Sequence, residues 1–103
     1  RNVLWSFLTK EDFIKTETRS DDVSRVLSYI AREFPPHLLY ILLWQDPQDG
    51  FIRALVAGED TFLAKITNET QPARHPSQRE ITEHFSAFPQ AESYINTLLD
   101  KVL

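Results

Sequence analysis

A short segment in the C-terminal half of the chain brings together four side chains that can contact an anion: Arg74, His75, Arg79 and His84. Guanidinium groups suit bidentate recognition of phosphate. The segment begins in residues 67–78, the most polar stretch of the chain and its longest predicted loop. The segment is therefore the best candidate for a phosphate-binding site. Three glutamates in the same segment dilute the positive field, which favours the alternative interpretation, solvated loop and helix charge.

Acidic residues occur as the pairs Glu11-Asp12 and Asp21-Asp22. Both pairs fall where a predicted helix begins, and the helix dipole favours negative charge there. Adjacent helical side chains point about 100° apart, so a pair does not converge on one metal ion. We therefore interpret both pairs as features of helix starts. The segment 46–50 (DPQDG) lacks the alternating acidic residues and terminal glutamate of a calcium loop, so it predicts a turn.

Composition removes several other kinds of chemistry. The chain contains no cysteine, which excludes disulfides, zinc–thiolate sites and thiol nucleophiles and fits a cytoplasmic protein. Only two glycines occur, so there is no glycine-rich phosphate loop. No serine has the context of a catalytic nucleophile, and His37 has no carboxylate nearby in the sequence, which favours a histidine at a strand end. The net charge of −4 argues against strong non-specific binding to a nucleic-acid backbone.

The hydrophobic pattern predicts the elements that must hold these side chains. Alternating or continuous apolar runs predict strands over residues 3–8, 38–44 and 51–57, the last two joined as a hairpin. Residues 61–66 predict a further strand or a short helix. Trp5, Tyr40 and Trp44 lie inside these apolar runs, which favours core packing over base stacking, and no run is long enough to span a membrane.

Apolar residues at helical spacing predict two long helices, over residues 21–34 and 90–103, and shorter helices over 10–15 and 78–85. Thr9 and Ser20 are the expected N-caps of the first two helices along the chain, and Pro35-Pro36 ends the second. Residues 1–103 are thus expected to form a single α/β domain. In it, a mixed, largely buried sheet of three to five strands is flanked by the two long helices.

Residues 3–66 contain a strand ending in Thr9, the acidic-aromatic turn Glu11-Asp12-Phe13, an acidic loop at residues 21–22, and then a helix and a strand pair. In this order of features the chain resembles the C-terminal substrate-binding domain of the DHH phosphoesterases, which include RecJ-like exonucleases and nanoRNA phosphatases. The resemblance implies an accessory domain excised from a longer protein, which positions a nucleotide or short oligonucleotide. The catalytic metal, such as manganese, and the Asp-His-His motif would belong to another domain, so this chain alone would hold no cofactor and catalyse no hydrolysis.

The chain departs from that family at both of its recognition motifs. The family's Ser-Leu-Arg-Ser strand corresponds to residues 54–57, where Val56 replaces the arginine. The family's Gly-Gly-Gly-His loop corresponds to residues 83–88, which contain His84 but no glycine. The closing helix matches in place and pattern. A degenerate relative is therefore one reading, with an oligonucleotide, a nucleotide or the catalytic domain of the same chain as partner. The alternative is a protein–protein interaction or regulatory domain with no catalytic or nucleic-acid role.

Overall fold

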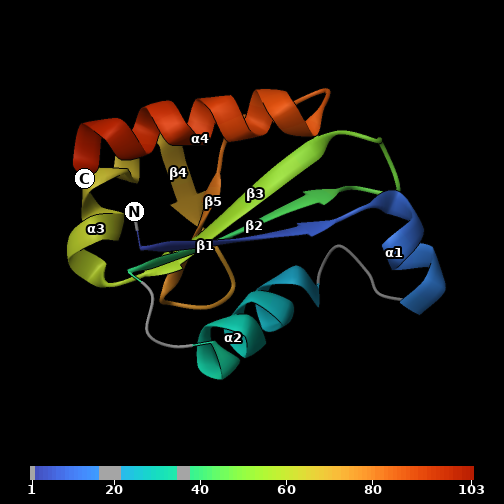
Figure 1. The fold of residues 1–103 in the computed structure, drawn as a ribbon, viewed down its shortest axis with the longest axis horizontal. Helices are drawn as coiled ribbons and strands as arrows, with labels where there is room; N and C mark the ends of the chain where they lie inside the picture. Colours follow the sequence, from blue (N-terminus) through green and yellow to red (C-terminus); the bar gives the residue numbers. More distant parts are fainter. Residues whose placement is uncertain (1, 17–21, 35–37) are drawn as a thin grey trace.

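The computed structural model describes residues 2–16, 22–34 and 38–103, and in these residues five strands form one mixed sheet (Figure 1). The strands are β1 (Val3–Leu8), β2 (Leu39–Gln45), β3 (Ile52–Gly58), β4 (Thr70–Pro72) and β5 (Gln78–Ile81). Their order across the sheet is β1-β2-β3-β5-β4. Only β1 and β2 are parallel among these strands, and the other pairs are antiparallel. The predicted α/β class and mixed sheet are confirmed.

The centre of the sheet consists of β2 and β3, the two strands of the predicted hairpin. Residues 39–44 are all buried, which explains why their sequence shows no polar alternation. The DPQDG turn joins the strands as predicted: Gly50 has a φ of 77° and donates its N–H to the Asp46 carbonyl at 2.8 Å. The register pairs Gln45 with Ile52. The other strands pair with this hairpin on either side, β1 with β2 and β5 with β3.

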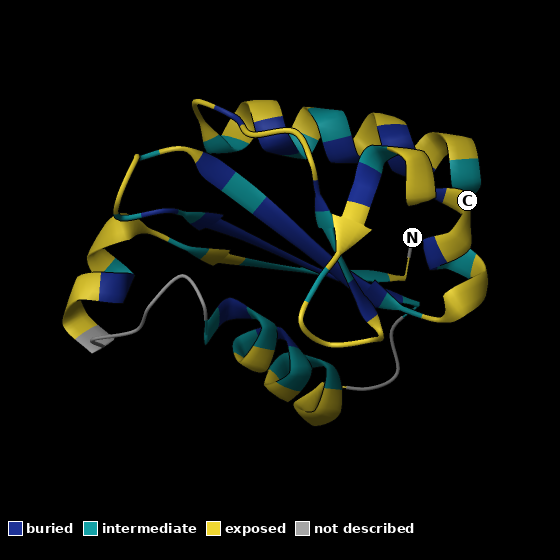
Figure 2. Cartoon of the chain, turned by 180° about the vertical axis from the view of Figure 1, so that it is seen from behind, coloured by how far each residue is buried: buried dark blue, intermediate teal, exposed yellow. Residues whose placement is uncertain are grey.

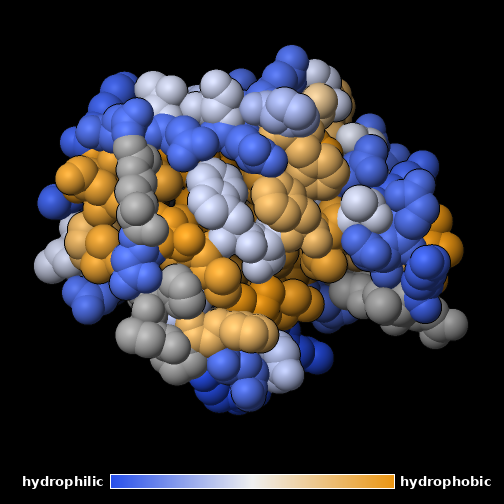
Figure 3. All heavy atoms as spheres, in the orientation of Figure 1, coloured by the Kyte–Doolittle hydropathy of each residue, from blue (hydrophilic) through white to orange (hydrophobic). Residues whose placement is uncertain are grey.

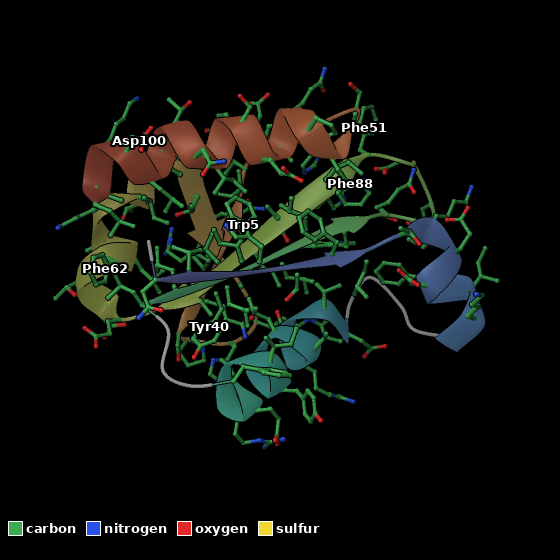
Figure 4. The ribbon with its side chains drawn as sticks, in the orientation of Figure 1. Trp5, Tyr40, Phe51, Phe62, Phe88 and Asp100 are labelled. Atoms are coloured by element: carbon green, nitrogen blue, oxygen red, sulfur yellow. The ribbon has the colours of Figure 1, made fainter. Side chains whose placement is uncertain are left out.

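Helices cover both faces of the sheet (Figure 1). The helix α2 (Val23–Glu33) lies on one face, while α4 (Phe88–Val102) and the short α3 (Asp60–Lys65) lie on the other. Two hydrophobic clusters result: Trp5 packs against the cluster on the α4 side, and Tyr40 belongs to the cluster on the α2 side (Figure 4). The expected core placement of Tyr40 and Trp44 is confirmed, whereas Trp5 is only partly buried.

The short helix α1 (Lys10–Thr16) begins with the predicted cap. The Thr9 hydroxyl accepts from the Asp12 N–H at 3.3 Å, and the Asp12 carboxylate accepts from the Thr9 N–H at 2.8 Å. Residues 61–66 are largely helical, one of the two predicted options. Ser20, Asp21, Pro35, Pro36 and His37 lie outside the described residues.

The helix predicted over residues 78–85 is wrong. Residues 78–81 form β5, which pairs Glu80 with Leu55 of β3, and Phe85 then makes an isolated bridge to Ile52. The backbone of β3 has an open side there, and pairing satisfies more of its polar groups than an isolated short helix would. The predicted loop 67–78 is also shorter than expected, because a 3-10 turn (Thr67–Glu69) and β4 occupy its first part.

The two edges of the sheet differ. The β4 edge is short and exposed and ends at Pro72, which has no N–H to offer (Figure 2). The β1 edge is six uncharged residues long, and a band of hydrophobic side chains runs along it between α4 and α2 (Figure 3). None of the described helices has the length and apolar character needed to cross a membrane.

Candidate anion-binding cleft

The four predicted anion-binding residues do not gather in one place. Arg74 and His75 lie in the connection between β4 and β5 and share a cleft with α2. Arg79 is on β5 and bonds to β4, and His84 bonds to the β2–β3 hairpin. Residues close in sequence are separated here because β5 lies between them. Successive side chains of a strand point to opposite faces of the sheet, and β5 takes the chain along β3 toward the other end of the sheet.

The cleft that contains Arg74 and His75 has a volume of about 390 Å³. We call it the α2 cleft, and its lining residues are Asp22, Ser24, Arg25, Ser28, Arg74 and His75. Among the described residues that line it, two arginines, one histidine and two hydroxyl groups therefore face a single carboxylate. The first turn of α2 forms one wall, so the positive end of the helix dipole adds to this field.

Arg25 is the member of the cleft most available to a ligand. It is exposed, and within the described residues no hydrogen bond or ion pair of its guanidinium is found. Sequence reasoning missed it because Arg25 lies about fifty residues before Arg74, and only the fold places the two beside one cleft. The available signal was the polar face of α2, where Ser24, Arg25 and Ser28 follow one another at helical spacing.

Gln78 fastens the two walls of the cleft together. Its side-chain amide donates to the Ser24 carbonyl and to the Ser28 hydroxyl oxygen, each at 2.9 Å. Gln78 is only 3% exposed, and its Oε1 has no hydrogen-bond partner among the described residues. The bond to the Ser24 carbonyl requires the amide nitrogen on the α2 side, since a carbonyl can only accept a hydrogen bond. The position of β5 relative to α2, and so the shape of the cleft, thus depends on a buried amide whose nitrogen is hydrogen-bonded and whose oxygen is not.

His75 is oriented by its own loop. The Ser77 N–H donates to Nδ1 of His75 at 3.3 Å. In the neutral imidazole this places the remaining proton on Nε2. The Nε2–H of this exposed residue then remains as a donor. This arrangement suits an oxyanion in the cleft without requiring a charged histidine.

Arg79 is committed to the structure of the sheet edge. Its Nε donates to the Thr70 hydroxyl oxygen at 2.6 Å, and its Nη2 donates to the Thr70 carbonyl at 3.2 Å. Alternation along β5 places Arg79 on the same face as Ile81, which belongs to the α4-side core, whereas Gln78 faces α2. Arg79 therefore points away from the α2 cleft and ties β5 to β4.

His84 belongs to a second polar group, which we call the hairpin cluster: Asp46, Asp49, Arg53 and His84. Arg53 donates to Asp46 at 2.9 Å, to Asp49 at 2.6 Å and to Nε2 of His84 at 2.6 Å. The hydrogen bond from the Phe51 N–H lowers the pKa of Asp49, and the charge of Arg53 lowers it further. Sequence reasoning missed Arg53 because its partners come from a turn and from a loop thirty-one residues away.

Of the two segments that the resemblance compares with recognition motifs, the one on β3 is closed to a ligand at the position of the arginine. Val56 of β3 is 2% exposed and lies in the α4-side core, so nothing can reach it from solvent. Glu83 and His84 are exposed, but His84 is already bonded to Arg53. No group of three or more histidines, aspartates or glutamates in the described part of the chain is placed to hold a metal ion.

Comparison with known proteins adds no assignment. No model of a protein family matches this chain, and no curated protein matches it either. Any function must therefore be argued from the α2 cleft and the surfaces around it.

Proposed function

We propose that this chain is an accessory domain that binds a phosphate group of a nucleotide or short oligonucleotide in the α2 cleft. We propose further that it belongs to a DHH-type phosphoesterase or a degenerate relative. The observation that carries the proposal is the convergence of Arg25, Arg74 and His75 on one cleft, although they come from separate parts of the chain. Arginine with a neighbouring N–H donor is the combination that proteins use for phosphate oxygens.

The hydroxyl groups and the helix start support the same ligand. Ser28 accepts from Gln78 and retains its own hydroxyl hydrogen for a ligand oxygen. Ser24 lies one residue before Arg25, in the first turn of α2. Asp22, which also lines the cleft, opposes an anion and restricts binding to the side nearer the arginines. We therefore expect modest affinity that depends strongly on salt concentration.

This proposal assigns recognition to the chain and leaves hydrolysis to a separate domain. The divalent metal that the resemblance implies would be held there. Arg79 and His84, two of the residues expected to bind phosphate, serve the sheet edge and the hairpin cluster in our account. The proposed phosphate contacts therefore reduce to Arg74 and His75, with Arg25 added.

An amide-resolved NMR titration with 5′-AMP and with inorganic phosphate at low salt tests the proposal. We expect shifts that localise to the first turns of α2 and to residues 74–78 and that disappear as salt is added. The Arg25→Gln variant should weaken binding roughly tenfold, and Lys101→Gln on the exposed side of α4 should leave it unchanged. Absence of shifts at millimolar ligand, or shifts confined to other surfaces, contradicts the proposal.

A second candidate function, protein–protein interaction, is favoured by the β1 edge. Its six residues carry no charge, and Phe7 is 45% exposed. Phe7 stacks edge-on against Phe88, with ring centroids 5.8 Å apart, which extends the apolar surface onto the start of α4 (Figure 4). Natural sheets protect an open edge with charge, proline or a cover, and β1 has none of these within its own sequence.

Self-association or capture by a partner at this edge is tested by a Phe7→Lys variant. Sedimentation of the wild-type chain should show association that persists at high salt, because an apolar strand edge is not screened. The variant should remain monomeric. A wild-type chain that is monomeric at high concentration contradicts this second candidate.

A further inference from the structure

The α2 cleft continues into a second hollow along the outer face of the same helix. This hollow has a volume of about 430 Å³. We call it the outer groove, and its lining residues are Arg25, Val26, Ser28, Tyr29 and Arg32. Arg25 and Ser28 line both hollows, so they form one continuous surface. A ligand that enters the α2 cleft can therefore extend along α2.

The outer groove presents charge and an aromatic ring in a regular order. Arg25, Tyr29 and Arg32 are spaced at i, i+4 and i+7, which places them on one face of α2. Arg25 and Arg32 are separated by about 10 Å along the helix axis. In single-stranded nucleic acid, each nucleotide offers a phosphate to a cation and a base to an aromatic ring, so this order of side chains provides contacts for both.

Tyr29 has the properties expected of a stacking residue. It is 54% exposed, although it lies on a helix whose opposite face is packed on the sheet. The Arg32 guanidinium lies over its ring, 5.7 Å from the centroid, and limits the positions that the ring can adopt. Arg32 also contacts Glu33 at 3.6 Å, with both side chains largely exposed, so that ion pair is readily exchanged for a phosphate.

We propose that the outer groove binds a single-stranded oligonucleotide whose terminal phosphate lies in the α2 cleft. One base stacks on Tyr29, and a later phosphate contacts Arg32. About 10 Å corresponds to roughly three nucleotides of a stacked strand, at 3.4 Å each. This inference rests on the proposed phosphate site, and it adds the path of the strand and the residue that recognises the base. It predicts that the affinity for an oligonucleotide depends on the number of its nucleotides as well as on its terminal phosphate.

The test measures binding of 5′-AMP and of single strands of two and four adenylates at low salt by NMR titration of the 103-residue chain. We expect the four-nucleotide strand to bind at least tenfold more tightly than 5′-AMP. Tyr29→Leu should remove most of this difference, and Tyr29→Phe should keep it, because stacking needs the ring and not the hydroxyl group. Arg32→Gln should weaken the four-nucleotide strand several-fold and leave 5′-AMP unaffected.

The outcomes separate this inference from the proposed function. If 5′-AMP binds at the α2 cleft but longer strands bind no more tightly, the phosphate site stands and the strand path is wrong. The inference is also wrong if Tyr29→Leu and Tyr29→Phe bind the longer strand as tightly as each other. If neither 5′-AMP nor the strands shift any amide near α2, both proposals fail. Thermal unfolding of each variant confirms that the substitution at an exposed site left the fold intact.

Discussion

Two sites in this molecule contain the same residue types, arginine, histidine and aspartate, but differ in how their arginine donors are used. In the hairpin cluster, Arg53 donates to Asp46, Asp49 and His84 at 2.6–2.9 Å, and its side chain is only 20% exposed. In the α2 cleft, Arg25 is exposed and no donor of its guanidinium is engaged within the described residues. The comparison shows that an arginine indicates a binding site only where its own donors remain available, as those of Arg25 do among the described residues.

The largest expected effect comes from removing the engaged arginine. Arg53→Gln leaves the nearly buried Asp46 carboxylate without its main partner, so we expect a loss of roughly 2–3 kcal/mol in the free energy of unfolding. Urea denaturation followed by tryptophan fluorescence measures this loss. A decrease below 0.5 kcal/mol would show that Arg53 is not the structural arginine of the pair.

A smaller loss is expected from the amide that joins β5 to α2. Gln78→Leu removes the bonds to Ser24 and Ser28, and an apolar side chain of similar size offsets part of the cost, so we expect about 1–2 kcal/mol. The same variant should weaken 5′-AMP binding, because the walls of the α2 cleft are no longer tied together. Urea denaturation measures the stability of the variant, and NMR titration measures its affinity for 5′-AMP. If both are the same as in the wild type, Gln78 does not hold the two walls of the cleft together.

The pH dependence of stability tests the ionised carboxylate of Asp49 in the hairpin cluster, and we expect a smaller loss of stability from its removal. The Phe51 N–H and the Arg53 charge lower the pKa of Asp49 in the folded chain, so its contribution to stability is present at neutral pH and is lost as the pH falls below about 4. The Asp49→Asn variant should therefore unfold at lower denaturant concentration than the wild type at pH 7, and the difference should shrink as the pH falls below about 4. A constant difference across this range would exclude the ionised carboxylate as the cause.

The smallest change in stability is expected at the available arginine. Arg25→Gln, the same substitution as at Arg53, should alter the free energy of unfolding by less than about 0.5 kcal/mol, since it removes no hydrogen bond or ion pair found among the described residues. Identical denaturation conditions for the two variants make this a matched pair. A loss at Arg25 comparable to that at Arg53 would remove the distinction between the two sites.

The sheet and its main helices could be predicted because their signals are local. Residues 39–44 form a continuous apolar run, the DPQDG turn has its own chemistry, and the last helix shows a clear apolar stripe. β5 could not be predicted in the same way. Ile81 and Phe85 are spaced as on a helix, and only the open side of β3 decides that this segment is extended.

The candidate site was only half predictable. Arg74 and His75 stand out in the sequence as a pair in a polar loop, but Arg25 becomes their neighbour only through the packing of α2 against β2 and β3. Arg79 and His84 seemed equally suitable, and their use elsewhere depends on Thr70 and Arg53, which the sequence does not place near them. Residue type indicates what a side chain can bind, whereas the fold determines whether its donors are already occupied.

The salt dependence of oligonucleotide binding tests the central claim most directly. The logarithm of the affinity for the four-nucleotide strand is measured against the logarithm of salt concentration for the wild type, Arg25→Gln and Lys101→Gln, each variant lacking one positive charge. The slope is negative, and our account predicts that Arg25→Gln reduces its magnitude by about 0.7, the value for one phosphate contact to a single strand. Lys101→Gln should leave the slope unchanged. Equal slopes for all three proteins would show that Arg25 contacts no phosphate and would contradict the assignment of the α2 cleft.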